Sequence, residues 1–138
     1  MKQIIIPYQP RSPQLEIHNN LKKRNVIVAH RRMGKTTCLL NELIKRALTT
    51  QKTDARYYYV APFLSQAKAI AWDFLKYYTK NLPNIKINET ELRIDFHNGS
   101  RIRLFGADNP DALRGLYIDG IVLDEYGDIK PTFYTEVI

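Results

Sequence analysis

The chain has 138 residues, of which 44% are hydrophobic and 25% charged, as is typical of one folded domain with its own core. Its net charge of +7 favours polyanionic partners such as nucleic acids or nucleotides, and its single cysteine excludes an internal disulfide framework. No apolar run approaches the ~20 residues that span a bilayer, and the N-terminus lacks the apolar stretch of a secretory signal. We therefore expect a domain of a reducing compartment with no membrane partner.

The first half of the chain alternates between helix and strand patterns. Residues 12–21 have apolar positions at near-helical spacing, with Ser12 as the expected N-cap. Residues 25–29 (Asn-Val-Ile-Val-Ala) form a β-branched run typical of a strand buried on both faces. After a loop at 30–34, apolar residues within 39–48 follow a 3.6-residue period and predict an amphipathic helix.

The second half continues this alternation and adds a hairpin. Residues 56–61 predict a second strand, and a long helix is expected from Ser65, as its N-cap, to Leu82. Residues 92–105 alternate apolar and polar side chains around an Asn-Gly turn, which predicts two antiparallel strands. Residues 120–125 have the pattern of a buried strand that ends in two acids. We therefore expect an α/β fold with a mainly parallel sheet, flanking helices and an antiparallel hairpin addition.

A candidate phosphate-binding loop lies between the first expected strand and the helix that follows it. Residues 29–36 (Ala-His-Arg-Arg-Met-Gly-Lys-Thr) match the G-x-x-x-x-G-K-[ST] pattern except at Ala29, which replaces the first glycine. Backbone N–H groups at a helix start attract phosphate oxygens. Gly34 permits close approach of the backbone, Lys35 can reach the terminal phosphates and the Thr36 hydroxyl can ligate Mg²⁺. The alternative is a chance Gly-Lys-Thr at an ordinary helix start.

The acidic end of the strand at 120–125 supplies the second half of a nucleotide site. A carboxylate at the tip of a buried strand can hold Mg²⁺ through a water, which suits Asp124. An adjacent carboxylate can orient or activate the attacking water, which suits Glu125 and favours ATP hydrolysis over nucleotide storage. Two solvated acids at a strand end are the alternative.

Several short motifs occur together in one order along the chain. They are residues 30–37 (His-Arg-Arg-Met-Gly-Lys-Thr-Thr), 59–62 (Tyr-Val-Ala-Pro), 66–68 (Gln-Ala-Lys) with Trp72 and Asp73, 113–115 (Leu-Arg-Gly) and 119–125 (Asp-Gly-Ile-Val-Leu-Asp-Glu). From about Tyr8 to its last residue, the chain thereby resembles the N-terminal ATPase domain of the large terminase subunit of tailed bacteriophages. That family packages DNA into procapsids and commonly replaces the first phosphate-loop glycine, in agreement with Ala29.

The resemblance implies a P-loop ATPase of the additional-strand, catalytic-glutamate type. The residues that it implies for ATP binding are Gln14, Arg31, Arg32, Met33, Gly34, Lys35, Thr36 and Thr37. Thr36 and Asp124 would hold Mg²⁺, and Glu125 would be the catalytic carboxylate. Arg31 would touch the γ-phosphate or couple its loss to motion, and Arg114 would act as a finger in a neighbouring subunit.

Some of these assignments have simpler alternatives. Adenine recognition could fall to Tyr8 with either Gln9 or Gln14, or these glutamines could be ordinary turn or helix residues. Arg31 and Arg32 could be solvated loop cations, and Arg114 could brace a surface helix. Arginines of the hairpin could line a DNA channel or simply face solvent: Arg93, Arg101 and Arg103. Tyrosines of the second strand could stack bases or simply be buried: Tyr57, Tyr58 and Tyr59.

At the level of the whole protein, the resemblance implies a motor that drives double-stranded DNA into procapsids. Its partners would be a portal protein, a small terminase subunit and further copies of itself in a ring, in the host cytoplasm. We expect residues 1–138 to be a single ATPase domain, the N-terminal part of a longer terminase, without the family's coupling motif and nuclease domain. A helicase-like DNA translocase and a non-catalytic nucleotide-binding assembly module are the alternative functions.

Overall fold

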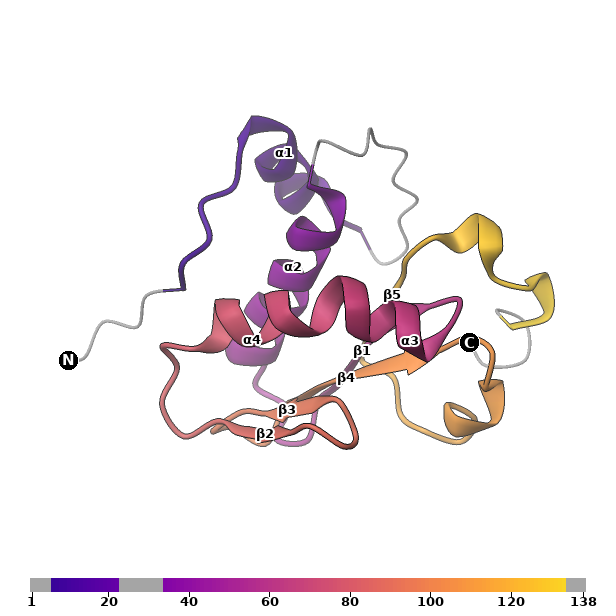
Figure 1. Cartoon of the computed structure of the whole chain (residues 1–138). Coiled ribbons are helices and arrows are strands. Elements are labelled where there is room, and N and C mark those ends of the chain that lie inside the picture. Colours follow the sequence, from indigo (N-terminus) through magenta and orange to yellow (C-terminus); the bar gives the residue numbers. More distant parts are fainter. Residues whose placement is uncertain (1–5, 23–33, 134–138) are drawn as a thin grey trace.

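The structure is a computed structural model that describes residues 6–22 and 34–133. Helical segments are α1 (Ser12–Asn20), α2 (Lys35–Thr49), α3 (Leu64–Ala67), a π-helical turn (Lys68–Trp72) and α4 (Asp73–Thr79), with short 3₁₀ turns at Pro110–Ala112 and Tyr126–Asp128. Strands are β1 (Arg56–Ala61), β2 (Lys86–Asn88), β3 (Arg93–Asp95), β4 (Arg101–Gly106) and β5 (Gly120–Leu123). The described strands form one sheet in the order β2-β3-β4-β1-β5 (Figure 1).

Strand β1 is at the centre of the parallel part of this sheet. It pairs in parallel with β4, where Arg56 is opposite Arg101, and with β5, where Tyr59 is opposite Val122. Strands β3 and β4 are antiparallel, so the hairpin predicted at 92–105 is confirmed. Its second strand also pairs with β1 and therefore belongs to the main sheet, and β2 extends the antiparallel edge. The strand predicted at 25–29 lies outside the described residues.

The first two predicted helices are confirmed as α1 and α2, but the predicted N-cap of the first is wrong. Arg11 occupies the N-cap position and Ser12 is the first helical residue. The backbone N–H of Arg11 donates to Gln14 Oε1 at 2.9 Å, so the helix start is satisfied by the side chain at N3. Helix α2 buries one apolar face against the sheet: Leu40, Leu43, Ile44 and Ala47.

The long helix expected from Ser65 is helical from residue 64 to residue 79, with two corrections. Phe63 is the N-cap, so Ser65 lies inside the helix, and the helix ends before Leu82. The π-helical turn in its middle adds a residue to one turn and rotates the residues that follow relative to the core. Phe74, in the segment just after this turn, is 46% exposed.

The two faces of the sheet have different coverings. Because side chains alternate along a strand, Tyr57 and Tyr59 of β1 pack in the cluster that contains α2 and α4. Tyr58 and Val60 point the other way and pack with Phe105 of β4 and with residues before and after β5: Leu113, Ile129 and Phe133. Figure 1 shows the labelled helices α1 to α4 gathered on one side of the sheet. No helix in the described ranges has the length and apolar character that a membrane crossing requires.

Candidate functional site

The site is built around Asp124, the residue that directly follows β5. Its backbone N–H donates to Val60 O at 2.9 Å, which continues the β1–β5 pairing by one residue, and the residue is only 2% exposed. The next residue, Glu125, has a left-handed backbone with φ 52° and donates its N–H to Asp124 Oδ1 at 3.0 Å. This turn leaves the Glu125 side chain exposed beside a buried carboxylate.

Helix α2 brings the Gly-Lys-Thr motif to this carboxylate. Thr36 Oγ1 donates to Asp124 Oδ2 at 2.8 Å across a sequence separation of 88 residues. Lys35 Nζ lies 3.4 Å from Asp124 Oδ1, so each carboxylate oxygen faces one residue of the motif. The proximity expected for these three residues is therefore present, while their roles toward a nucleotide stay predictions.

Tyr59 is a member of this cluster that the sequence analysis did not assign to the site. Its hydroxyl donates to Asp124 Oδ2 at 2.6 Å, and the residue is fully buried. Burial, together with the bond to Asp124, raises the pKa of Tyr59, so the hydroxyl stays a proton donor. The sequence signal for Tyr59 was weak: it lies near the carboxyl end of a predicted strand, and only the structure shows that its side chain is on the helix face.

The surroundings of Asp124 decide its charge state. Burial acts to raise its pKa, but hydrogen bonds from Tyr59 and Thr36 and the charge of Lys35 outweigh that effect. The pKa of Asp124 is therefore held below the ordinary value of an aspartate, and the group is an anion at neutral pH. A buried carboxylate beside a hydroxyl offers oxygen ligands to a cation. The neighbouring lysine can attract a phosphate group.

Gly34 joins this cluster to the N-terminal helix. It is the N-cap of α2 and has a left-handed backbone with φ 77°, which favours glycine. A Cβ there would lie 2.5 Å from Gln14 Nε2, which donates to Gly34 O at 3.0 Å. Gln14 is 4% exposed and its Oε1 accepts from Arg11 N, so both ends of its amide are bonded. Gln14 thus ties α1 to the start of α2, and its adenine role stays a prediction.

A polar network continues this connection between α1 and α2. Tyr8 bonds through its hydroxyl to His18 Nε2 at 2.8 Å, and His18 Nδ1 lies 2.7 Å from Glu42 Oε2. Burial raises the pKa of Tyr8, and the side chain of Cys38 lies against the same histidine. Gln9 is exposed in the segment before α1. Tyr8 is therefore held beside α2.

The remaining predicted site residues are placed differently. Arg31, Arg32 and Met33 lie outside the described residues. Thr37 is in the first turn of α2, where its carbonyl accepts from Asn41 Nδ2 at 2.9 Å. Arg114 lies on the crossing from β4 to β5, with its side chain 49% exposed.

The Tyr59–Asp124 bond should contribute measurably to stability. We expect Tyr59→Phe to lower the free energy of unfolding by about 1–3 kcal/mol, because a buried carboxylate loses a hydrogen-bond donor while the ring is kept. Tyr57→Phe is the matched control: its hydroxyl lies 3.4 Å from Arg46 O on the same face of β1, so about 1 kcal/mol or less should be lost. Urea unfolding measures both, and equal losses would contradict the special position of Tyr59.

The sequence and the fold of the chain were compared with those of known proteins. The family model of the terminase large subunit, T4likevirus-type, N-terminal, matches residues 26–138. The "Thermus Phage P74-26 Large Terminase ATPase domain" superposes with a TM-score of 0.78 at 25% identity, over 96% of this chain and 60% of that chain. No curated protein sequence matches the chain significantly.

More distant solved structures have the same fold. A large terminase from a thermophilic bacteriophage superposes with a TM-score of 0.74 at 16% identity, over 94% of this chain and 36% of that chain. The same terminase in complex with ATP-gamma-S superposes with a TM-score of 0.67 at 14% identity, over 91% of this chain and 33% of that one. The chain thus spans less than two thirds of these relatives, and the α/β fold of its described residues is that of terminase ATPase domains. The chain belongs to the family of N-terminal domains of T4likevirus-type terminase large subunits.

Proposed function

We propose that the chain is the ATP-binding and ATP-hydrolysing motor domain of a phage terminase large subunit that drives double-stranded DNA into procapsids. The observation that carries this proposal is the contact of Lys35 and Thr36 with the buried Asp124. A helix start, a lysine and a hydroxyl facing a strand-end carboxylate are the parts that phosphoryl-transfer sites of this type use. Membership of the terminase family supports the same function.

The residues present fit a magnesium ion. Thr36 offers a hydroxyl oxygen and Asp124 a carboxylate that is an anion at neutral pH, and Mg²⁺ prefers such oxygen ligands. Mg²⁺ bound there would neutralise negative charge on the nucleotide phosphates. Tyr59 and Thr36 hold one oxygen of Asp124, so the carboxylate is oriented before the nucleotide arrives.

Glu125 is the proposed catalytic carboxylate. It follows Asp124 directly, and its left-handed backbone directs the chain away from the strand while the side chain stays exposed. Non-glycine residues with a left-handed backbone occur more often at functional positions than elsewhere. From there the Glu125 carboxylate orients a water against the terminal phosphate, and Lys35 stabilises charge on that phosphate.

The partners follow from the family and from the charge of the chain. We propose double-stranded DNA as the transported polymer, a portal protein and a small terminase subunit as packaging partners, and a ring of large subunits in the host cytoplasm. A net charge of +7 favours the first of these partners.

Removal of the Lys35 charge tests nucleotide binding. We expect Lys35→Ala to weaken Mg–ATP binding ten-fold or more, about 1.4 kcal/mol, because the cation that faces the terminal phosphates is gone. The matched control is Lys45→Ala, which removes a lysine from the exposed side of the same helix and should leave affinity unchanged. Titration calorimetry measures both variants. Unchanged affinity of a folded Lys35→Ala protein would exclude this lysine from the phosphate site.

A further inference from the structure

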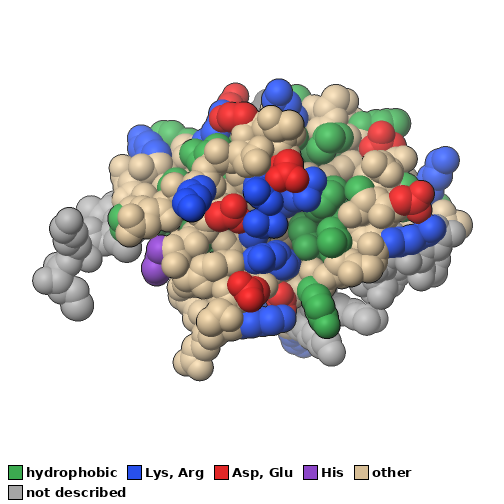
Figure 2. Space-filling view, turned by 90° about the horizontal axis from the view of Figure 1, so that it is seen from below, with side chains coloured by type: hydrophobic (Ala, Val, Ile, Leu, Met, Phe, Trp, Pro, Cys, Tyr) green, Lys and Arg blue, Asp and Glu red, His purple; other side chains and the backbone are tan. Residues whose placement is uncertain are grey.

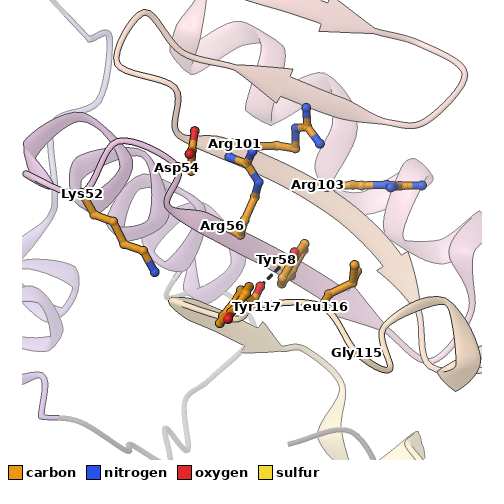
Figure 3. Close-up of a pocket in the computed structure, with 9 residues that line it drawn as sticks. All are labelled: Lys52, Asp54, Arg56, Tyr58, Arg101, Arg103, Gly115, Leu116 and Tyr117. Atoms are coloured by element: carbon orange, nitrogen blue, oxygen red, sulfur yellow. Dashed lines mark hydrogen bonds between the residues drawn. The ribbon is translucent and has the colours of Figure 1, made fainter.

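The sheet face opposite the helices has a cationic hollow at the amino-terminal half of β1 and β4. Figure 2 shows this face, with Lys and Arg side chains gathered across its middle. An open groove of about 710 Å³ lies there, and Figure 3 shows its lining. Its lining includes four basic side chains, two tyrosines and one carboxylate: Lys52, Arg56, Arg101, Arg103, Tyr58, Tyr117 and Asp54. The groove is separate from the site at Asp124, which follows the opposite end of β5.

Three arginines form the floor of the groove because of the strand register. Arg56 is opposite Arg101 in the β1–β4 pair, and Tyr58 is opposite Arg103, so all these side chains share one face. Arginines on two hydrogen-bonded strands are held at fixed spacing, unlike lysines on a loop. The groove therefore presents three guanidinium groups from neighbouring positions on one face of the sheet.

The arginines differ in how far their charge is neutralised. Arg101 Nε donates to Asp95 Oδ1 at 2.5 Å. Arg103 lies 3.9 Å from Glu91 and over the ring of Phe105. The Arg56 guanidinium donates to the carbonyls of residues 55 and 99, and no carboxylate among the described residues lies within 4.0 Å of it. Arg56 and Arg103 are thus the cations of the floor best able to attract an anion.

The rim of the groove adds an aromatic surface. Tyr117 is 82% exposed. Its carbonyl accepts a hydrogen bond from the Tyr58 hydroxyl at 3.0 Å, which holds the segment before β5 against strand β1. Lys52 Nζ lies 5.6 Å from the centre of the Tyr117 ring and is paired with Asp119 at 2.7 Å. An exposed ring beside guanidinium groups is suited to sugars and bases that adjoin phosphates.

We propose that this arginine groove binds the phosphodiester backbone of DNA, a step that rests on the proposed packaging function. Arginine forks match phosphate oxygens, and a cluster of arginines on one face can contact neighbouring phosphates of one polymer. An acidic protein segment is disfavoured because the groove floor is the interior of a sheet, with no free strand edge to pair with a peptide backbone. The contact is sequence-independent, as a packaging motor requires.

The test is binding of a short fluorescein-labelled DNA duplex, followed by anisotropy over a series of salt concentrations. For Arg56→Gln combined with Arg103→Gln we expect affinity to fall about ten-fold or more and the slope of log K against log salt to decrease by about 2. The control is Lys45→Gln combined with Lys68→Gln, which removes the same charge from the helices on the other face. That control should bind DNA as the unaltered chain does.

Three results would overturn the proposal: no DNA binding by the unaltered chain, unchanged binding by the arginine variant, or equal losses in the arginine variant and its control. A labelled polyglutamate that binds in place of DNA, and is lost in the arginine variant, would assign the groove to an acidic protein instead. Calorimetry with Mg–ATP on the same proteins keeps the two proposals apart. A chain that binds DNA through the groove but not Mg–ATP contradicts the nucleotide function alone.

A label supplies a second measurement that does not remove any arginine. Cys38 is the single cysteine and is buried, so Tyr117→Cys can be labelled selectively with an environment-sensitive dye. The same dye on Tyr77→Cys, at a position 47% exposed on the helix layer, is the control. DNA should change the emission at position 117 and leave it unchanged at position 77, and the reverse pattern would contradict the groove.

Discussion

We expect Glu125→Gln to reduce ATP turnover by about 10²–10⁴ while Mg–ATP affinity stays within a few-fold of the unaltered protein. Glutamine keeps the shape of the side chain but cannot accept a proton from the attacking water. Binding is preserved because the proposed phosphate and metal contacts belong to Lys35, Thr36 and Asp124. Phosphate release in the steady state measures turnover, and calorimetry measures binding.

Two further variants sharpen this test. Asp128→Asn neutralises an exposed carboxylate in the 3₁₀ turn just after Glu125 and should leave turnover unchanged. Asp124→Asn should instead weaken Mg²⁺-dependent binding, since it removes the anion that faces Lys35 and Thr36. Hydrolysis by Glu125→Gln at the unaltered rate would move the catalytic role to another residue.

The second large loss of ATP turnover is expected from substitution of Arg114. We expect this residue to complete the active site of a neighbouring subunit. Leu113 anchors this loop, since it is 1% exposed and packs in the cluster of Tyr58 and Phe105. Arg114 follows it on the surface, and Gly115, with φ 79°, turns the chain. We expect Arg114→Ala to reduce turnover of the assembled motor by about 10³–10⁵ and to leave nucleotide binding by single subunits unchanged.

Mixed assemblies decide whether Arg114 acts in its neighbour. Arg114→Ala and Glu125→Gln should each be inactive alone, but mixed rings contain junctions with one intact glutamate and one intact arginine. Partial recovery of ATPase activity on mixing is therefore expected. Arg114 Nη1 lies 2.9 Å from Asp111 Oδ1, so Asp111→Ala is the control for a bracing role. It should keep full turnover.

Other outcomes would assign Arg114 differently. If Asp111→Ala loses as much activity as Arg114→Ala, the ion pair braces the loop and the guanidinium needs no partner subunit. If mixing restores nothing, while Arg114→Ala is inactive, the arginine acts within its own subunit.

Local order along the chain could be predicted from the sequence. Strand β1 occupies the residues expected, 56–61, because a β-branched and aromatic run ends at a proline. Helix α2 was predicted because its apolar residues repeat every 3.6 positions. The π-helical turn at Lys68–Trp72 was not, since the periodicity of short apolar segments does not distinguish an α turn from a π turn.

The site was predicted in its chemistry but not in its full membership. Lys35, Thr36 and Asp124 stood out because glycine, lysine, hydroxyl and carboxylate occur where a helix starts and a strand ends. Tyr59 did not, because a tyrosine in a buried strand is ordinary until the neighbouring strand places a carboxylate 2.6 Å from its hydroxyl. The contact of the Gln14 amide with the Gly34 carbonyl was also not predictable, because it joins residues 20 positions apart, and the choice between Gln9 and Gln14 for adenine stays a prediction.

By itself, the sequence determined the α/β class, the order of the described elements other than β2 and the residue types of the candidate site, because these depend on neighbours within a few positions. Only the tertiary structure decided that β4 pairs in parallel with β1 and that Arg56, Arg101 and Arg103 share one open face. The physical reason is that strand order and register arise from pairing between segments far apart in the chain. A side chain's burial and partners follow from that pairing and not from its own local pattern.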